Sequence, residues 1–287
     1  MTAPRIPMVI LLVAVMAVRP AAAAGGGWTP PTPAFQAGTE LHATADHLEG
    51  DFTRHHLLLV GNVTLVGDTQ EIHAARLSMT LDAEGRRIET LDGSGQVRLI
   101  YGPYTAVADR ILFDNAAGHA RLLGHARIWG EGREMAGDTI DLDLHRKVVE
   151  VAAGRVHLPA HGDIPSLRVA ANTIVADDAS GRAELTGAVT VTSGPRHLSA
   201  DHAVVELDPA TGDVRQLRAD GDLRIVDGDR HGRADRGAYD LVKRSLVLEG
   251  NADLTEGGSR LLGERIRVSL TTRQVQVERG TIHYRQQ

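Results

Sequence analysis

Glycines set inside alternating apolar segments recur along the chain. Their spacings are 34, 29, 30, 33, 34, 29 and 30 residues, at Gly61, Gly95, Gly124, Gly154, Gly187, Gly221, Gly250 and Gly280. Because the series 34, 29, 30 occurs twice, the full period is four units, or 126 residues. Aligning residues 41–161 without gaps to the residues 126 positions later gives 29 identities in 121 positions. A repeat of this kind indicates an internal duplication.

Within a unit the hydrophobic period is two, which predicts β-strands. Leu57, Leu59, Val63 and Leu65 fall on one face with Gly61 between them. Turn sequences separate the strands, such as Asp-Asn-Ala-Ala-Gly (114–118). Aspartate bonds to the backbone that follows it and glycine supplies positive φ, so these segments predict tight connections. No long segment after the first residues shows helical periodicity.

The strands must each bury one apolar face, which an antiparallel sandwich or an incompletely closed barrel achieves. A right-handed parallel β-helix also has repeats of 20–30 residues. The turn chemistry favours antiparallel hairpins. We therefore predict an all-β protein of two tandem antiparallel domains.

The fourth unit is out of step with the other three. Val149 and Val151 lie at odd offsets from Gly154, and Val275 and Val277 do so from Gly280. A slip of one residue in both copies predicts a β-bulge.

Aromatic residues make up 3% of the chain, so the interior must consist of Val, Leu, Ile and Ala. Such an interior fills less space than that of a typical sandwich. A gap that side chains leave open is suited to acyl chains, which is one hypothesis for function.

Several segments resemble the periplasmic lipopolysaccharide-transport bridge family, LptA/OstA. They are LVGNVTL (59–65), DGSGQVRL (92–99), LLGHARI (122–128), GRVHL (154–158) and, in the second copy, LEGNADL (248–254). Four such units make one family domain, so the chain resembles two domains in tandem.

The resemblance implies slightly open, twisted β-jellyrolls, stacked end to end, each enclosing a hydrophobic groove. It further implies transport of lipopolysaccharide from an inner-membrane transporter to an outer-membrane translocon. The expected partners are lipopolysaccharide, the related domains of those two complexes through edge strands, and further copies of the chain, head to tail. A sheet edge offers the unpaired N–H and C=O groups that such pairing needs.

The candidate lipid-binding residues are inward apolar positions, for which ordinary core packing is the alternative interpretation. They are Leu59, Val63, Leu65, Met79, Leu81, Phe113, Ile128, Ile140, Leu142, Leu185, Val189, Val205, Leu207, Tyr239, Leu254, Ile266 and Val268. Five arginines are candidates for meeting phosphates at the groove mouth, although a solvated face balanced by carboxylates is the simpler interpretation: Arg54, Arg196, Arg230, Arg233 and Arg236.

No enzyme, metal site or cofactor is expected. An acidic residue recurs once per unit before a strand, as at Asp46, Asp109 and Asp235. A catalytic pair or a calcium ladder would use such carboxylates. Their regular recurrence, with Ala75 and Asn172 as replacements, instead favours turn caps or solvated edges. The chain has no cysteine, no HExxH and no G-x-S-x-G motif. A net charge of -6 without a basic block argues against nucleic acid binding.

The first residues predict a cleaved secretory signal, residues 1–24. Arg5 precedes the apolar run of residues 8–18 and the small-residue site of residues 21–24. That run is shorter than the roughly 18 residues that a membrane-spanning helix needs. The expected organisation is a leader at 25–38, domains at 39–160 and 167–287, and a linker at 161–166, in the periplasm. A structural or adhesive envelope protein without lipid cargo is the alternative function.

Overall fold

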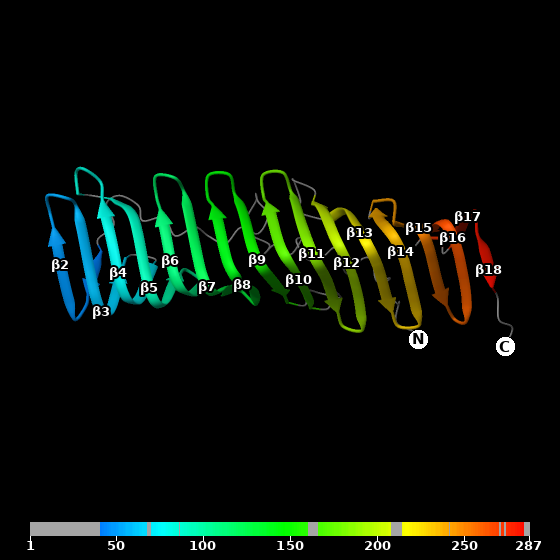
Figure 1. Ribbon diagram of the computed structural model, residues 1–287, viewed down its shortest axis with the longest axis horizontal. Helices are drawn as coiled ribbons and strands as arrows, with labels where there is room; N and C mark the ends of the chain where they lie inside the picture. Colours follow the sequence, from blue (N-terminus) through cyan, green and yellow to red (C-terminus); the bar gives the residue numbers. More distant parts are fainter. Residues whose placement is uncertain are drawn as a thin grey trace. The chain divides into compact units, whose positions relative to one another are not determined.

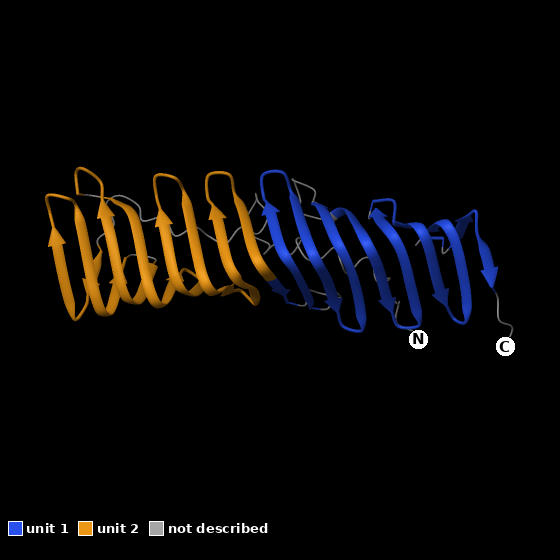
Figure 2. Cartoon of the chain, viewed as in Figure 1, with its two compact units in different colours: residues 1–28, 155–287 blue, residues 29–154 orange. Residues whose placement is uncertain are grey.

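The structure is a computed structural model, and it describes residues 41–67, 70–85, 87–159, 166–207, 214–240, 242–269, 271–272 and 274–283. These residues divide into two compact units on either side of residue 154, here called the N-terminal and C-terminal units (orange and blue in Figure 2). The predicted signal and leader, and residues 161–165 of the predicted linker, lie outside the described residues. The predicted domain limits stay a prediction.

The N-terminal unit is a sheet of antiparallel strands in which sequence neighbours are also spatial neighbours (Figure 1). The pairings run from β3 through β8, with β1 and β2 sharing β3 as their partner. The strands are β1 (His42–Thr44), β2 (His47–Asp51), β3 (His56–Val66), β4 (Gln70–Leu81), β5 (Ile88–Tyr101), β6 (Tyr104–Asp114), β7 (His119–Gly130), β8 (Arg133–Asp143) and β9 (Val148–Leu158), which crosses the unit boundary.

The C-terminal unit repeats this arrangement, with β17 and β18 sharing β16 as their partner. Its strands are β10 (Leu167–Asp177), β11 (Arg182–Ser193), β12 (Arg196–Leu207), β13 (Val214–Asp227), β14 (Arg230–Asp240), β15 (Ser245–Glu256), β16 (Ser259–Ser269), β17 (Val275–Glu278) and β18 (Thr281–His283). The all-β antiparallel prediction is confirmed, and the parallel β-helix is wrong. The described part of the chain contains no helix long and apolar enough to cross a membrane.

A β-bulge interrupts nearly every long strand close to its middle. In β3, Val60 pairs with Arg76 of β4, and the next pair is Val63 with Ala74. Between these pairs β3 therefore has one residue more than β4. The same irregularity recurs at Ser94/Val97 in β5 and at Leu123/Ala126 in β7. A bulge bends its strand and increases the local twist, so a row of bulges across neighbouring strands folds the sheet over.

The acidic residues that recur once per unit sit over the glycines of these bulges. A Cβ on Gly124, whose φ is 74°, would lie 2.9 Å from the Cγ of Asp109 on the preceding strand. Asp109 in turn accepts a 2.9 Å hydrogen bond from Nδ1 of His125, the residue after the glycine. In the second copy Asn251 donates to Asp235 at 3.1 Å in the same way. Each carboxylate therefore packs against the bulge of the next strand and holds it by a hydrogen bond, which differs from the predicted role as a turn cap or solvated edge.

The burial pattern and backbone of β9 agree with the bulge predicted for the fourth unit of the first copy. Val149 and Val151 are buried, and the buried positions then move to Gly154 and Leu158. Ala153, which lies at this change of phase, has a φ of 50°. In the other units the non-glycine residue with positive φ follows the glycine, whereas here it precedes it, which explains the slip of one residue.

Candidate lipid-binding face

The apolar face of the N-terminal unit borders a narrow cavity of about 40 Å³. Residues on both sides of the bulges line it: Leu91 and Leu99 on β5, and Leu122 and Ile128 on β7. Two halves of one strand can border one cavity only if the strand bends between them, which is the bend that the bulge supplies. Tyr101 of β5 and Ala120 of β7 also line it, and the remaining walls come from β4, β6 and β8, at Ile72, Tyr104, Thr105, Ala106, Ile111, Phe113 and Leu142.

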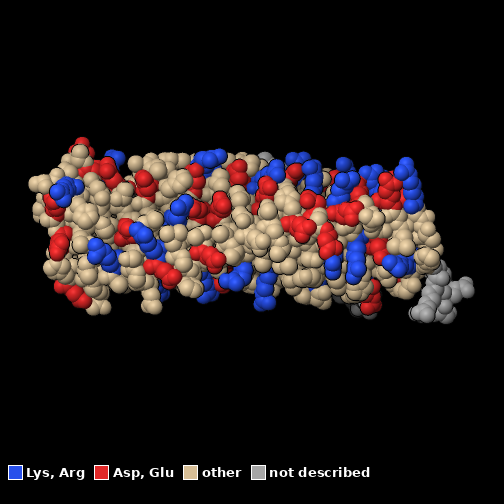
Figure 3. All heavy atoms as spheres, viewed as in Figure 1, with Lys and Arg blue, Asp and Glu red and all other residues tan. Residues whose placement is uncertain are grey.

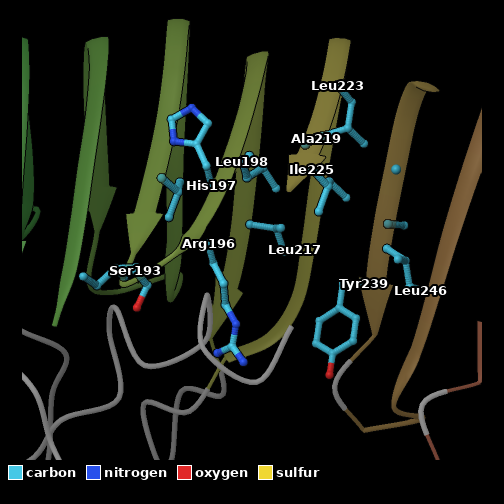
Figure 4. Close-up of a pocket in the computed structure, with 14 residues that line it drawn as sticks. Ser193, Arg196, His197, Leu198, Leu217, Ala219, Leu223, Ile225, Tyr239 and Leu246 are labelled. Atoms are coloured by element: carbon cyan, nitrogen blue, oxygen red, sulfur yellow. The ribbon is translucent and has the colours of Figure 1, made fainter. Parts of the chain in front are cut away.

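A cavity of about 40 Å³ occupies the corresponding part of the C-terminal unit. Leu198, Leu217 and Ile225 extend into its middle (Figure 4). The guanidinium of Arg196 and the ring of Tyr239 extend toward one side of it in the same view. A second cavity of about 30 Å³ shares Ile225 and Leu246 as walls, so the two spaces adjoin. Both are concave and mainly apolar, which is typical of sites for apolar ligands.

Most of the predicted lipid-binding residues are buried on this face. The buried ones are Leu59, Val63, Leu65, Met79, Phe113, Ile128, Ile140, Leu142, Leu185, Val189, Val205, Tyr239, Leu254 and Ile266. Leu81 and Val268 are half-buried. The side chain of Leu207 lies outside the described part of the structure.

The cavities bring together a smaller set of those residues. Phe113, Ile128 and Leu142 line the N-terminal cavity, and Tyr239, Leu254 and Val268 line the two C-terminal ones. The other described candidates do not line these cavities and pack within the sheet. Whether any of them contacts lipid stays a prediction.

Several cavity residues escaped the sequence prediction. Leu91 and Leu99 lie in β5, and their equivalents Leu217 and Ile225 lie in β13. The residues of each pair lie eight positions apart, an even spacing, so simple alternation already places both on one face. The duplication is a second signal that could have identified them, since Leu91 and Leu99 each recur 126 residues later as an apolar residue.

The two units differ in the residues at the strand ends that border their cavities. Four charged residues of the C-terminal unit, here called the charged row, lie on adjacent strands: Arg196, Asp227, Arg230 and Glu256. The residues 126 positions earlier are Gln70, Tyr101, Tyr104 and Gly130, which are paired in the same register. Arg196 lines the first C-terminal cavity, and Asp227, Arg230 and Glu256 line the second. Both tyrosines line the N-terminal cavity.

Tyr239 is the aromatic residue that replaces Phe113 in the second copy. Burial raises the pKa of Tyr239 to about 12, because a phenolate would be poorly solvated there. The phenol therefore stays neutral across the physiological pH range and adds a hydrogen-bond donor to an apolar wall.

The outward face is charged but balanced. Acidic and basic side chains are interspersed on the face seen in Figure 3. Bidentate pairs such as Arg110–Asp92 and Arg260–Asp253 join neighbouring strands. Of the predicted phosphate-contacting arginines, Arg54, Arg233 and Arg236 are exposed, whereas Arg196 and Arg230 belong to the charged row. No group of three or more potential metal ligands occurs among the described residues.

Each unit has exposed apolar side chains at the strands that share one partner, β2 in the N-terminal unit and β17 and β18 in the C-terminal unit. Leu48 in β2 is 55% exposed, and Phe52, the first residue after β2, is 83% exposed. In the C-terminal unit Val275 and Ile282, in β17 and β18, are 39% and 64% exposed. Large exposed apolar side chains beside unpaired strand backbone mark a surface suited to strand addition.

The fold defines the class of protein, an all-β protein with an apolar, cavity-bearing face in each unit, and the comparisons identify its family. The sequence profile of the family described as LptA/(LptD N-terminal domain) LPS transport protein matches residues 42–148 and 168–274. The chain belongs to this family, which consists of transport proteins, and it carries two copies of the family domain.

Among solved structures, the chain is similar to LptH, described as the LptA homologous periplasmic component of the conserved lipopolysaccharide transport device from Pseudomonas aeruginosa. The identity is 18% over 39% of this chain and 82% of LptH, with a TM-score of 0.35. No curated protein sequence matches the chain.

Proposed function

We propose that this chain is a periplasmic bridge protein that carries lipopolysaccharide from an inner-membrane transporter to an outer-membrane translocon. The apolar cavity in each unit is the observation that carries the proposal. Each cavity is narrow, about 40 Å³, and its walls are almost entirely apolar, which suits an apolar ligand that widens the space as it enters. Acyl chains are ligands of matching chemistry, and family membership supports lipopolysaccharide as their source.

The sheet edges support the proposed partners. An incoming strand would pair with β2 or β18 and cover Leu48, Phe52 or Ile282 as it does so. The proposed partners are therefore the related domains of the two membrane complexes and further copies of this chain, joined head to tail.

Site-specific photo-crosslinking tests the cargo. The photoreactive amino acid p-benzoylphenylalanine replaces Phe113, which lines the N-terminal cavity, or Trp129, which lies on the outward side of the neighbouring strand. Both replacements exchange one aromatic ring for another, so each is a control for the other's effect on folding. Lipopolysaccharide should crosslink at position 113 and much less at position 129.

Equal crosslinking at the two positions would count against a binding face. A folded protein that captures no lipid at either position would favour the structural or adhesive envelope protein instead. A reconstituted system of transporter, bridge protein and translocon tests the direction of transport. In that system lipid should leave the inner membrane only when the bridge protein is present.

A further inference from the structure

The charged row is unusual because it lies on the apolar face of the sheet. Asp227 follows buried Ile225 at a spacing of two, and Arg230 precedes buried Gly232 at the same spacing. Side chains two residues apart on a strand point to the same side. The row therefore faces the cavities and not the outward surface.

The fold does not require these charges. The side chains of Arg196 and Asp227 are 19% and 21% exposed, and they form a 3.0 Å ion pair between Nε and Oδ1. Removing such a pair from water costs free energy that its attraction often fails to recover. The N-terminal unit forms the same ladder with Gln70 and Tyr101 in these places, so an uncharged row suffices for folding.

Arg230 carries an unused donor. Its Nη2 pairs with Glu256, but its Nε is buried and has no hydrogen-bond partner among the described residues. A buried donor without an acceptor costs about 1 to 3 kcal/mol. An oxygen acceptor on a ligand would remove this cost, and phosphate matches the guanidinium fork better than a neutral group does.

Glu256 is the more exposed of the two carboxylates in the row and therefore the more easily replaced. Glu256 is 55% exposed, so water already competes for it, and it contacts Arg230 on one edge only. A phosphate monoester carries close to two negative charges at neutral pH and offers three oxygens. It would therefore hold Arg230 more strongly than Glu256 does.

We propose that the C-terminal unit binds the phosphate-bearing head of an amphiphile at Arg230 and Arg196, with its acyl chains in the adjoining cavities. The N-terminal unit, whose row is Gln70, Tyr101, Tyr104 and Gly130, holds acyl chains without selecting a charged head. The inference rests on the proposed function, and it makes the two copies unequal in specificity.

Two photoreactive amphiphiles with the same sixteen-carbon diazirine chain test this inference on the intact protein. One has a phosphate monoester head and the other a neutral maltoside head. Mass spectrometry maps the labelled peptides to the N-terminal or C-terminal cavity. The neutral probe should label both units to a similar extent, whereas the phosphate probe should favour the C-terminal unit about tenfold, as charge-assisted hydrogen bonds imply.

Matched variants assign the selectivity to the row. Arg230→Gln should abolish the tenfold preference, and Arg230→Lys should restore part of it through charge alone. Arg233→Gln removes the same charge from the exposed, outward side of the same strand and should leave the preference unchanged. The reciprocal pair Gln70→Arg with Tyr104→Arg should raise labelling of the N-terminal unit by the phosphate probe.

The outcomes separate the two proposals. If neither probe labels cavity residues, the proposed function fails. If both probes label both units equally, or if Arg233→Gln acts like Arg230→Gln, the proposed function stands and the charged row has no selective role. Inorganic phosphate alone should bind far more weakly than the phosphate amphiphile; equal affinity would mean a simple anion site and would overturn the inference.

Discussion

The pairing of Asp109 with Gly124 predicts a measurable coupling in stability. An alanine at position 124 must adopt a φ of 74°, which costs about 1 to 2 kcal/mol for a residue with a Cβ. Its Cβ would also lie 2.9 Å from Cγ and 3.0 Å from Cβ of Asp109, with Oδ2 closer still. Overpacking of this kind adds about 1 to 3 kcal/mol. We expect Gly124→Ala to lower the free energy of unfolding by about 2 to 4 kcal/mol in total, since part of the overlap relaxes.

A double-mutant cycle separates the two costs. Gly102 has a φ of 53°, and no described atom lies within 4 Å of the position that a Cβ would take there. Gly102→Ala should therefore show the backbone cost alone, about 1 to 2 kcal/mol. Asp109→Ala by itself should cost less than about 1 kcal/mol, because its bond to His125 is exposed. In the Asp109→Ala background, Gly124→Ala should lose most of the steric part and approach the Gly102→Ala value.

The assay is equilibrium urea unfolding followed by the fluorescence of Trp129, which lies in the same strand as Gly124. Trp28, the other of the two tryptophans in the chain, is replaced by phenylalanine in every variant so that the fluorescence reports the N-terminal unit. Additive costs in the cycle would refute the reasoning, because they would show that the carboxylate does not press on the glycine. Equal costs for Gly124→Ala and Gly102→Ala in the original background would refute it as well.

The packing, the charges and the edges give three further predictions. Ile140→Ala should destabilise the N-terminal unit by about 2 to 5 kcal/mol, as measured by the same fluorescence, because this side chain is fully buried; a cost below about 1 kcal/mol would contradict it. Asp220 and Glu184 raise the pKa of His202 by hydrogen bonding to its ring, Asp220 more strongly. The protonated ring of His202 should therefore contribute its full stabilisation below the ordinary pKa of histidine, about 6.5. That stabilisation should be lost as the pH rises through the raised pKa. Urea midpoints of His202→Gln measured between pH 6 and 9 should lack this component, and an unchanged pH profile would count against it. Leu48→Lys should reduce concentration-dependent assembly in light scattering if the edges mediate it, whereas Val242→Lys, at an exposed residue between β14 and β15, should not.

The strands, their antiparallel order and the duplication were predictable because they rest on local patterns. Period-two alternation and Asp…Gly turns are encoded within a few residues of each other, so Leu59 and Val63 were correctly placed on the buried face. The fourth-unit bulge was predictable for the same reason, since Val149 and Val151 change phase relative to a glycine only a few residues away.

The cavity itself was less predictable, because it depends on residues brought together by bending. Leu91 and Leu99 border the same cavity only after β5 folds at its bulge. The charged row was obscured for another reason. Asp227 and Arg230 flank Gly228 and Asp229, and Asp-Gly-Asp-Arg resembles an ordinary exposed turn. The inward direction of their side chains is evident only when the register of β13 and β14 is known.

The broken edges have a consequence for selectivity. β1 and β2 are separated at Asp46, which faces Gly61 of β3, and β17 and β18 are separated at Arg279 and Gly280. A straight extended strand therefore finds no uninterrupted row of backbone groups along either edge. Long flat edges act as templates for aggregation, and native proteins protect them by bending or shortening. The interruption favours an incoming strand that carries the same bend, and it discourages the indiscriminate growth of fibrils at these exposed strands.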